Sequence, residues 1–342
     1  MESILVFTHT DESGKALTKA SLEAIAAGEK FAALLGCAWS VALLGPADAL
    51  HDVGDCGAQF YVVDQEAFAQ PRYATDAAVL ETLCRTTGAT IVLAPHSARV
   101  ARVAAGVAHR LGGFIDTHIT GFGGDATLTV SRWFYRQRIE AALSRTARPW
   151  FLLLEPGSHA PFALEDSATA KNIQKVTVEL PATRTTVTGT RAPQQGQQTI
   201  RPDASLLFVA GAGWTKKQAN GQVRTDDAAR IILGFLNNSG ASLGSSKSLV
   251  DQGGEGNSVL PFLTHMNQIG QTGATPRHPR GLATCCHGEE PHVVGWRFIA
   301  DRRAISLDPN CGWTRGKADV VYIADAFEVM EKVNELLATR QQ

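Results

Sequence analysis

The first half of the chain alternates short apolar runs with segments of helical periodicity, and this alternation most constrains the fold. ILVFTH (4–9) is typical of a buried strand, and the Ala- and Leu-rich segment 16–36 has helical spacing and a terminal Gly. Further strands are expected at 39–45, 60–64 and 89–95, and further helices at 75–88 and 97–113. Such alternation joins parallel strands through crossover helices, so it predicts an α/β domain with a mostly parallel sheet and helices on both faces.

Two later apolar segments extend this domain. WFYRQRIEAALS (133–144) and RPWFLLLEPG (148–157) are each predicted as a strand, and their direction, parallel or antiparallel, stays open. The composition then changes over 181–203, where Thr, Gln, Pro and Arg interrupt the apolar periodicity. That composition predicts a linker or an exposed meander. We therefore expect an N-terminal, nucleotide-binding-like α/β domain over 1–195 and a C-terminal domain over 204–342.

A second strand–helix series follows the linker and predicts a doubly wound parallel sheet in the C-terminal domain. Thr225 is the expected N-cap of a helix with Asp226 and Asp227 in its first turn. The expected strands are 205–213, a short one ending at 242–244, 281–288, 303–309 and 318–325, and the expected helices are 225–240 and 326–340.

The composition excludes several classes of partner. The formal net charge is -1 and the 32 Lys and Arg residues are scattered, so nothing favours nucleic acid or an anionic membrane surface. No apolar run approaches the ~20 residues that span a bilayer, and the N-terminus lacks the basic start of a signal peptide. Six cysteines without a CxxC pair do not form a disulfide framework, which favours a reducing cytoplasm, most simply that of a bacterium.

Three segments of the second half have ligand chemistry and a plain alternative. FVAGAG (208–213) is a strand followed by a small-residue turn that can present backbone N–H groups to a phosphate, but it lacks both GxGxxG and the acid for a ribose. An NAD-dependent enzyme is therefore the least favoured interpretation. SLGSSKS (242–248) and NQIGQTG (267–273) offer hydroxyls, amides, glycines and one cation, and are equally typical of solvated loops.

CCHGEEPH (285–292) contains four side chains that can bind a metal ion. They are Cys285, Cys286, His287 and His292. Their spacing matches no zinc pattern, and vicinal cysteines do not easily point at one ion, so we assign no metal ligand here. GxSxG, the mark of one large class of serine hydrolases, is absent as well.

Taken in order, the motifs of the second half resemble those of the electron transfer flavoprotein alpha subunit family. The most specific one is QIGQTG (268–273), which is similar to the flavin-holding QxGQTGK loop of the family. LGSSKSLVDQG (243–253) resembles VGASRxxVDxG, and AISLDP (304–309) stands where the family has AINxDP. HGEEPHVVGW (287–296) and the C-terminal segment 318–337 also match in order, and the first half follows the family plan more loosely.

The resemblance implies an electron carrier rather than an enzyme that converts a substrate. It implies FAD held mainly by a Rossmann-like C-terminal domain, in a heterodimer with a beta subunit that holds AMP or a second FAD. Electrons would arrive from a flavin-dependent dehydrogenase and leave to a membrane quinone oxidoreductase.

The resemblance also carries residue roles over by position. Thr272 would hydrogen-bond near flavin N5 and Gln271 would hold the ribityl-phosphate side, while Gly270 and Gly273 let the backbone approach the cofactor. Charge-assisted hydrogen bonds near the C2 carbonyl of the flavin stabilise negative charge on the flavin ring. The remaining expected FAD-binding residues are Ser246 at the phosphates, Lys247 and His292 near that carbonyl, Asp325 near the adenosine, and Gly213, Gln268, His287 and Ser306.

Several of these positions depart from the family pattern. The family has a cation where this chain has Gly213 or Ala212, an Arg at Lys247, a Lys at Ala274, a Ser at His287 and an Asn at Ser306. Lys216, Lys217 and Arg277 are the cations available to replace them. We expect FAD binding with an altered potential or affinity, and a specialised donor such as a dehydrogenase of N-methylated amines (dimethylglycine or sarcosine). The alternative is a flavin-poor scaffold or a nucleotide-sensing subunit of the same descent.

Overall fold

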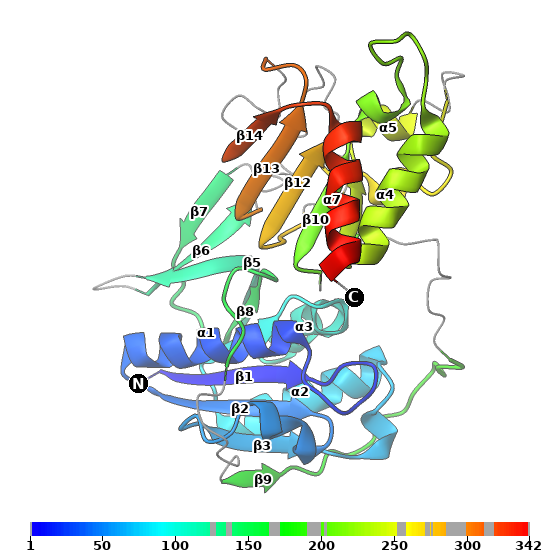
Figure 1. Ribbon diagram of the computed structural model, residues 1–342. Helices are drawn as coiled ribbons and strands as arrows, with labels where there is room; N and C mark the ends of the chain where they lie inside the picture. The colour runs from blue at the N-terminus through cyan, green and yellow to red at the C-terminus, as the bar shows by residue number, and fades with distance from the viewer. Residues whose placement is uncertain are drawn as a thin grey trace. The chain divides into compact units, whose positions relative to one another are not determined.

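The chain divides into two compact units, residues 1–189 and 190–342. Figure 1 shows both in a computed structural model, and each is an α/β structure built on one sheet. The structure describes residues 2–123, 128–134, 139–163, 172–189, 200–201, 204–251, 258–270, 274, 276–284, 299–310 and 318–340. In this part of the chain no helix is long and apolar enough to cross a membrane.

The N-terminal unit contains a mixed sheet, of which the described residues form nine strands. Their order across the sheet is β7-β6-β5-β8-β4-β1-β2-β3-β9. All neighbours from β5 to β9 in that order are parallel, whereas β6 and β7 are antiparallel additions at one edge. The strands are β1 (Ser3–His9), β2 (Ala38–Leu44), β3 (Gln59–Val63), β4 (Ile91–Pro95), β5 (Phe114–Gly123), β6 (Thr129–Phe134), β7 (Ile139–Leu143), β8 (Trp150–Leu154) and β9 (Ile173–Lys175).

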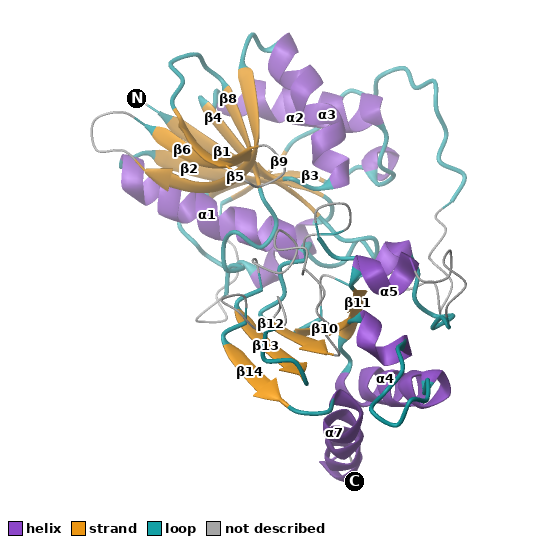
Figure 2. Ribbon diagram, turned by 90° about the horizontal axis from the view of Figure 1, so that it is seen from above, coloured by secondary structure: helices purple, strands orange, loops and turns teal. Residues whose placement is uncertain are grey.

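Helices cover both faces of this sheet, as the alternation predicted. Helix α1 (Lys19–Leu35) lies on one face, and α2 (Tyr73–Thr87) and α3 (Ala98–Arg110) lie on the other (Figure 2). Successive side chains of β1 point to opposite faces, so Val6 packs in the core under α1 while Phe7 packs in the core under α2 and α3. Strands β4 and β8 are buried along their whole length, which explains why their sequences are continuously apolar.

The edge of this sheet is where the sequence prediction was wrong. The segment 133–144 was expected as one strand, but it contributes to two antiparallel strands, β6 and β7. Strand β5 was not predicted at all. Strand β8, whose direction was left open, is a central strand parallel to both β4 and β5. The apolar residues of 133–144 do not show where β6 ends and β7 begins, and the continuously apolar sequence of β8 does not give its direction or its neighbours.

The C-terminal unit has a parallel, Rossmann-like sheet with five strands among the described residues, in the order β11-β10-β12-β13-β14. Helices α4 and α7 lie side by side on one face, over Phe208 and Ala210, while Leu207 and Val209 face the other side (Figure 1). The elements are β10 (Leu206–Ala210), β11 (Ser242–Ser245), β12 (Arg280–Thr284), β13 (Asp301–Ser306), β14 (Val320–Ile323), α4 (Thr225–Ser239), α5 (Lys247–Asp251) and α7 (Ala326–Arg340).

The ends of the helices follow the expected chemistry with one exception. Glycines at 36, 88 and 240 end α1, α2 and α4 in the left-handed conformation, with φ of 56°, 60° and 64°. Helix α4 has Asp226 and Asp227 in its first turn, as predicted, but Thr225 is its first residue and Arg224 occupies the N-cap position. The prediction of Thr225 as the N-cap was therefore wrong by one residue.

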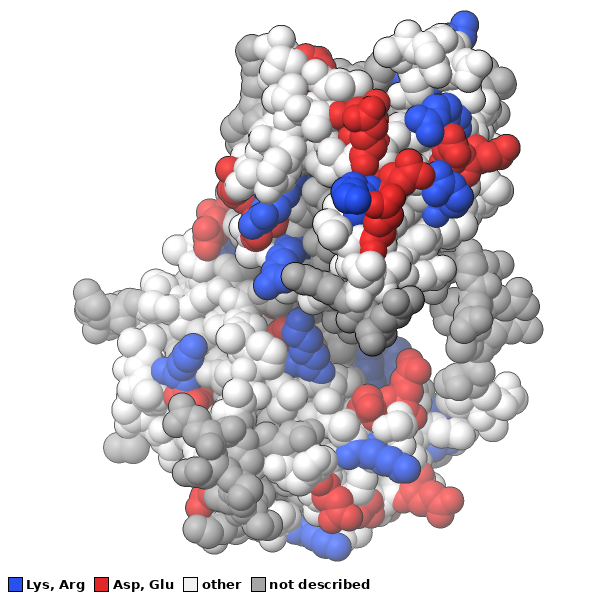
Figure 3. All heavy atoms as spheres, in the orientation of Figure 1, with Lys and Arg blue, Asp and Glu red and all other residues white. Residues whose placement is uncertain are grey.

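Four short 3₁₀ turns complete the described elements. They are η1 (Ala47–Asp52), η2 (Glu66–Phe68), η3 (Ala212–Thr215) and η5 (His265–Asn267). The outer surface of α4 and α7 is charged in both signs, and Arg230 joins the two helices through Glu331 at 2.7 Å. Figure 3 shows these charges interspersed, so this face does not form the single-sign surface that nucleic acid requires.

Candidate functional site

The carboxyl edge of the five-stranded sheet is where its topology places a ligand. Strand β10 comes first in the sequence of this unit, and the chain continues to β11 on one side of it and to β12 on the other. Strand order therefore reverses next to β10. Ligands of open α/β sheets bind outside the carboxyl ends of the strands at such a reversal.

The turn after β10 is held by side-chain packing. The N–H of Gly211 donates to the Thr284 carbonyl at 2.9 Å, which ties this turn to the end of β12. Trp214 fills the turn, with no exposed surface, and packs on Phe327 with ring centroids 4.5 Å apart. Gly213, a predicted FAD-binding residue, is buried here, and its carbonyl accepts from Gln218 at 2.9 Å.

Three predicted or neighbouring polar residues follow at the end of β11. The Ser246 N–H donates to the Ala210 carbonyl at 2.9 Å, and its hydroxyl accepts from the N–H of Leu249 in α5 at 3.2 Å. Lys247 is half-exposed and lies 3.8 Å from Asp251. Ser245 differs from both, because its side chain has no exposed surface and its hydroxyl oxygen has no hydrogen-bond partner among the described residues. A buried hydroxyl without a partner costs free energy that a bound polar group can recover.

The loop with the most specific motif runs along the end of β11. The Ile269 N–H donates to the Ser245 carbonyl at 3.1 Å, so Gln268 and Ile269 continue the pairing beyond the strand. Gly270 then has φ of 120°, a conformation that side chains disfavour, and its N–H donates to the Ala274 carbonyl at 2.8 Å. The glycine of the motif is therefore required by the backbone path beside Ser245.

Two predicted residues at the far strands have local structural roles. Ser306, at the end of β13, is buried, and its hydroxyl bonds the backbone of Asp308. Asp325, after β14, accepts the Phe327 N–H at 2.8 Å and so caps the start of α7. Both residues lie at the carboxyl edge of the sheet, as Ser246 and Gly270 do, but Asp325 is several strands away from that pair.

Five predicted site residues lie outside the described residues. They are Gln271, Thr272, Gly273, His287 and His292, and the same holds for Cys285 and Cys286. Of the replacement cations, Lys216 and Lys217 directly follow the η3 turn, whereas Arg277 precedes β12. The described residues that gather at β10 and β11 are thus Gly213, Ser246, Lys247, Gln268 and Gly270. Ser245 belongs to SLGSSKS (242–248), whose hydroxyls the sequence already offered to a ligand, although it was not among the expected FAD-binding residues.

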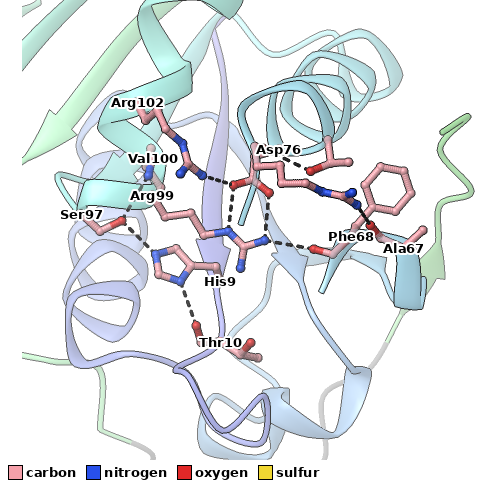
Figure 4. A network of polar contacts seen from close by, with 11 residues as sticks. His9, Thr10, Ala67, Phe68, Asp76, Ser97, Arg99, Val100 and Arg102 are labelled. Atoms are coloured by element: carbon pink, nitrogen blue, oxygen red, sulfur yellow. Dashed lines mark hydrogen bonds and ion pairs between the residues drawn. The ribbon is translucent and has the colours of Figure 1, made fainter. Parts of the chain in front are cut away.

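A second polar network lies in the N-terminal unit, at the carboxyl ends of β1 and β4 (Figure 4). The ring of His9 bonds the Thr10 carbonyl at 2.8 Å and the Ser97 hydroxyl at 2.9 Å. Burial lowers the pKa of His9 below its usual value. Asp76 and Arg99 form a bidentate ion pair beside it. These groups satisfy one another, so the network acts as a polar support for the sheet edge.

A comparison with known protein families shows which family the chain belongs to. A family model described as the electron transfer flavoprotein domain matches residues 5–181, more than half of the chain. This protein belongs to the electron transfer flavoprotein family. The match covers the N-terminal sheet of this electron transfer flavoprotein, whereas the likeness of its C-terminal unit rests on the motifs given above. A comparison with curated proteins found no match for the chain.

Proposed function

We propose that this chain is the alpha subunit of a heterodimeric electron transfer flavoprotein, with FAD held mainly by the C-terminal unit. In this proposal a beta subunit completes the heterodimer and holds AMP or a second FAD. A flavin-dependent dehydrogenase is the electron donor, a membrane quinone oxidoreductase is the acceptor, and the heterodimer works in the cytoplasm. The membership of the family and the order of the C-terminal motifs support this role.

One observation supports the cofactor site more than the others. The buried, unpartnered hydroxyl of Ser245 lies at the reversal of strand order, next to a loop whose glycine at 270 has φ of 120°. A dinucleotide needs buried polar partners and a backbone that approaches closely. The described residues at this edge offer both, so they fit an FAD molecule.

The proposed roles divide the edge between the parts of FAD. Ser245 and Ser246 present hydroxyls to its phosphate side together with Gln271, and Asp325 retains one carboxylate oxygen for the adenosine end. Thr272, His292 and Lys247 donate toward the ring, and Gln268, His287 and Ser306 complete the set. When bound, the flavin supplies reversible electron transfer. The protein orients the ring and adjusts its potential through these donors.

The proposed class of electron donor is based on the positions at which this chain departs from the family pattern. Lys247 stands where the family has Arg, and a lysine supplies a point charge without the fork of a guanidinium. Ala274 removes a further cation. Fewer fixed cations around the cofactor are expected to change its potential, which suits a specialised donor. We propose a dehydrogenase of N-methylated amines such as dimethylglycine or sarcosine.

Co-purification tests the function. The chain is expressed together with an electron transfer flavoprotein beta subunit, the complex is purified, and its absorbance is recorded before and after titration with FAD. A flavin spectrum at one equivalent per heterodimer in the C-terminal site is expected. A colourless heterodimer that takes up no FAD would refute the proposal and favour a flavin-poor scaffold or a nucleotide sensor.

Two variants then test the site and the donor. Thr272→Val is expected to shift the flavin potential without changing the far-UV circular dichroism, whereas the exposed Thr339→Val serves as the matched control. If neither FAD binding nor the potential moves in Thr272→Val, the QIGQTG loop is not the flavin loop. Reduction of the bound flavin by a dimethylglycine or sarcosine dehydrogenase, and not by an acyl-CoA dehydrogenase, is the expected donor specificity.

A further inference from the structure

Three metal-binding side chains meet at the carboxyl edge of the nine-stranded sheet in the N-terminal unit. His96 directly follows β4, Glu155 directly follows β8, and His118 lies within β5. One ligand atom from each of the three lies within 4.8 Å of the others. None of the three was predicted from the sequence, because neighbouring members of the set are more than 20 residues apart and share no motif.

The backbone holds the three residues in register. Strands β5, β8 and β4 are adjacent and parallel. The His96 N–H donates to the Leu154 carbonyl and the Glu155 N–H donates to the Ile119 carbonyl, each at 2.9 Å. The hydrogen bonds of the sheet therefore continue to the positions of the ligands, which places them on a rigid support.

Strand β5 deviates from regular geometry at His118. Between Asp116 and Ile119 the strand contains one residue more than its partner β8, so the register shifts. His118 has φ of 59°, which few residues other than glycine adopt. Bulges and strained residues of this kind redirect side chains next to functional sites. Here the deviation occurs at the residue that brings the second imidazole to Glu155.

The side chains have the donor atoms of metal ligands and lie close together. Glu155 is buried and lies 2.6 Å from Nδ1 of His118, and the rings of His96 and His118 meet edge to face with centroids 4.4 Å apart. Burial is the main reason that the pKa of His96 lies below its usual value; Arg132 lowers this pKa further and Glu155 raises it. Arg132 is itself compensated by Asp116 at 3.2 Å.

We propose that His96, His118 and Glu155 form a binding site for a divalent transition-metal ion, with Zn²⁺ as the ion that suits these donors. Two imidazoles and one carboxylate are the protein ligands of a class of zinc sites that keep one position open for water or a small ligand. Donors of such a site lie about 2.0–2.2 Å from the ion, so binding requires a small convergence of the three side chains. The ion would replace the hydrogen bond between His118 and Glu155. This site does not depend on flavin binding.

Metal titration of the full chain tests the site. The background is a Cys285→Ser/Cys286→Ser/Cys311→Ser variant, which removes the three thiols outside the described residues, and chelator-treated protein is titrated with Zn²⁺ and with Co²⁺. One equivalent of each is expected to bind, and the Co²⁺ spectrum is expected to lack the thiolate charge-transfer bands. The same protein is expected to melt at a higher temperature with Zn²⁺ than without it.

Variants assign the ligands. His118→Ala is expected to weaken Zn²⁺ binding by at least about a hundredfold, since the loss of an outer-shell partner alone weakens metal sites by about 10–100-fold. The matched control is His265→Ala. His265 pairs with Asp251 at 2.8 Å on the exposed surface, and neither residue belongs to the three-residue ligand cluster found among the described residues. Glu155→Gln is the second ligand variant, and the metal-free melting temperature of each variant reports whether it folds.

Two outcomes would overturn the site. Absence of stoichiometric Zn²⁺ and Co²⁺ binding by the folded background protein would show that the three residues are a hydrogen-bonded cluster. Equal binding by folded His118→Ala and by the background protein would place the ion elsewhere.

Discussion

The indole N–H of Trp214 donates to the hydroxyl of Thr284 across 2.9 Å, and it connects the turn after β10 with the carboxyl end of β12. Thr284 in turn donates to the Val209 carbonyl at 3.2 Å. Both side chains are fully buried. These two bonds fix the shape of the sheet edge at the reversal of strand order, next to the site that we assign to FAD.

Trp214→Phe is expected to lower the free energy of unfolding by more than about 1 kcal/mol, because it removes the hydrogen-bond donor and also leaves a cavity where the larger indole packed. Urea denaturation measures the loss. A double-mutant cycle with Thr284→Val isolates the bond, and a coupling energy near zero would show that it contributes nothing.

Ser245→Ala is expected to have opposite effects on the empty and the loaded protein. Removal of a buried hydroxyl without a partner leaves the unfolding free energy of the apoprotein unchanged or higher, whereas FAD affinity falls about fivefold, equivalent to about 1 kcal/mol. Ser239→Ala is the control, because its hydroxyl donates to the Phe235 carbonyl and accepts from the Ala241 N–H. It should cost stability and leave FAD affinity intact. Unchanged FAD affinity in Ser245→Ala contradicts the assigned contact.

Gly270→Ala is expected to reduce FAD uptake while the fold is retained. A side chain at φ of 120° adds strain of about 1–3 kcal/mol, and the loop has to leave the path along β11 to relieve it. Equilibrium dialysis with FAD and far-UV circular dichroism measure the two properties. Gly14→Ala, at φ of 70° in a solvent-exposed turn, is the strained control that should bind FAD normally.

Asp76→Asn is expected to destabilise the N-terminal unit by about 3 kcal/mol. Its carboxylate is 1% exposed and pairs with Arg99 and Arg102, each at 2.9 Å (Figure 4). The amide leaves the largely buried Arg99 without its counter-ion, and breaking a buried pair from one side is costly. Thermal denaturation provides the measurement. Glu81→Gln, which breaks an exposed pair with Arg85, should stay within about 1 kcal/mol, and an equal loss in both variants would contradict the role of burial.

The free energy of unfolding is expected to fall as the pH decreases from about 6.5. Burial lowers the pKa values of His9 and His96, so below that pH the unfolded chain binds protons that the native chain does not. A second loss is expected below about pH 4, because hydrogen bonds from Arg148 lower the pKa of Glu2. Denaturant midpoints in metal-free buffer from pH 8 to 3 follow both steps. A constant midpoint between pH 7 and 5 would contradict the first one.

Periodicity was sufficient for most of the elements, but it missed β5 and β9 and did not give the order of the strands in the sheet. The first strand and α1 were predicted from an apolar run and a helical segment that ends at Gly36, since both signals act over a few residues. The position of β8 between β4 and β5 was not predictable, because two strands with equally apolar sequences can exchange places in a sheet without changing their patterns. The segment 133–144 was predicted as one strand because its sequence does not show where β6 ends and β7 begins.

The candidate sites, too, were predictable only where their residues are close together in the sequence. QIGQTG and the serines after β11 were found from the sequence, because a cofactor loop keeps its donors within a few residues of one another. Only the packing of β11 against its loop shows that the Ser245 hydroxyl is buried and has no hydrogen-bond partner among the described residues.

The sequence by itself determined the two α/β series, the glycine helix ends and the family motifs, because each depends on residues close together in the chain. Only the tertiary structure brought His96, His118 and Glu155 together, with one ligand atom of each residue within 4.8 Å of those of the other two. Their meeting depends on the order of three parallel strands and on one bulge in β5. Contacts between distant segments are set by the packing of the whole sheet, which local patterns do not encode.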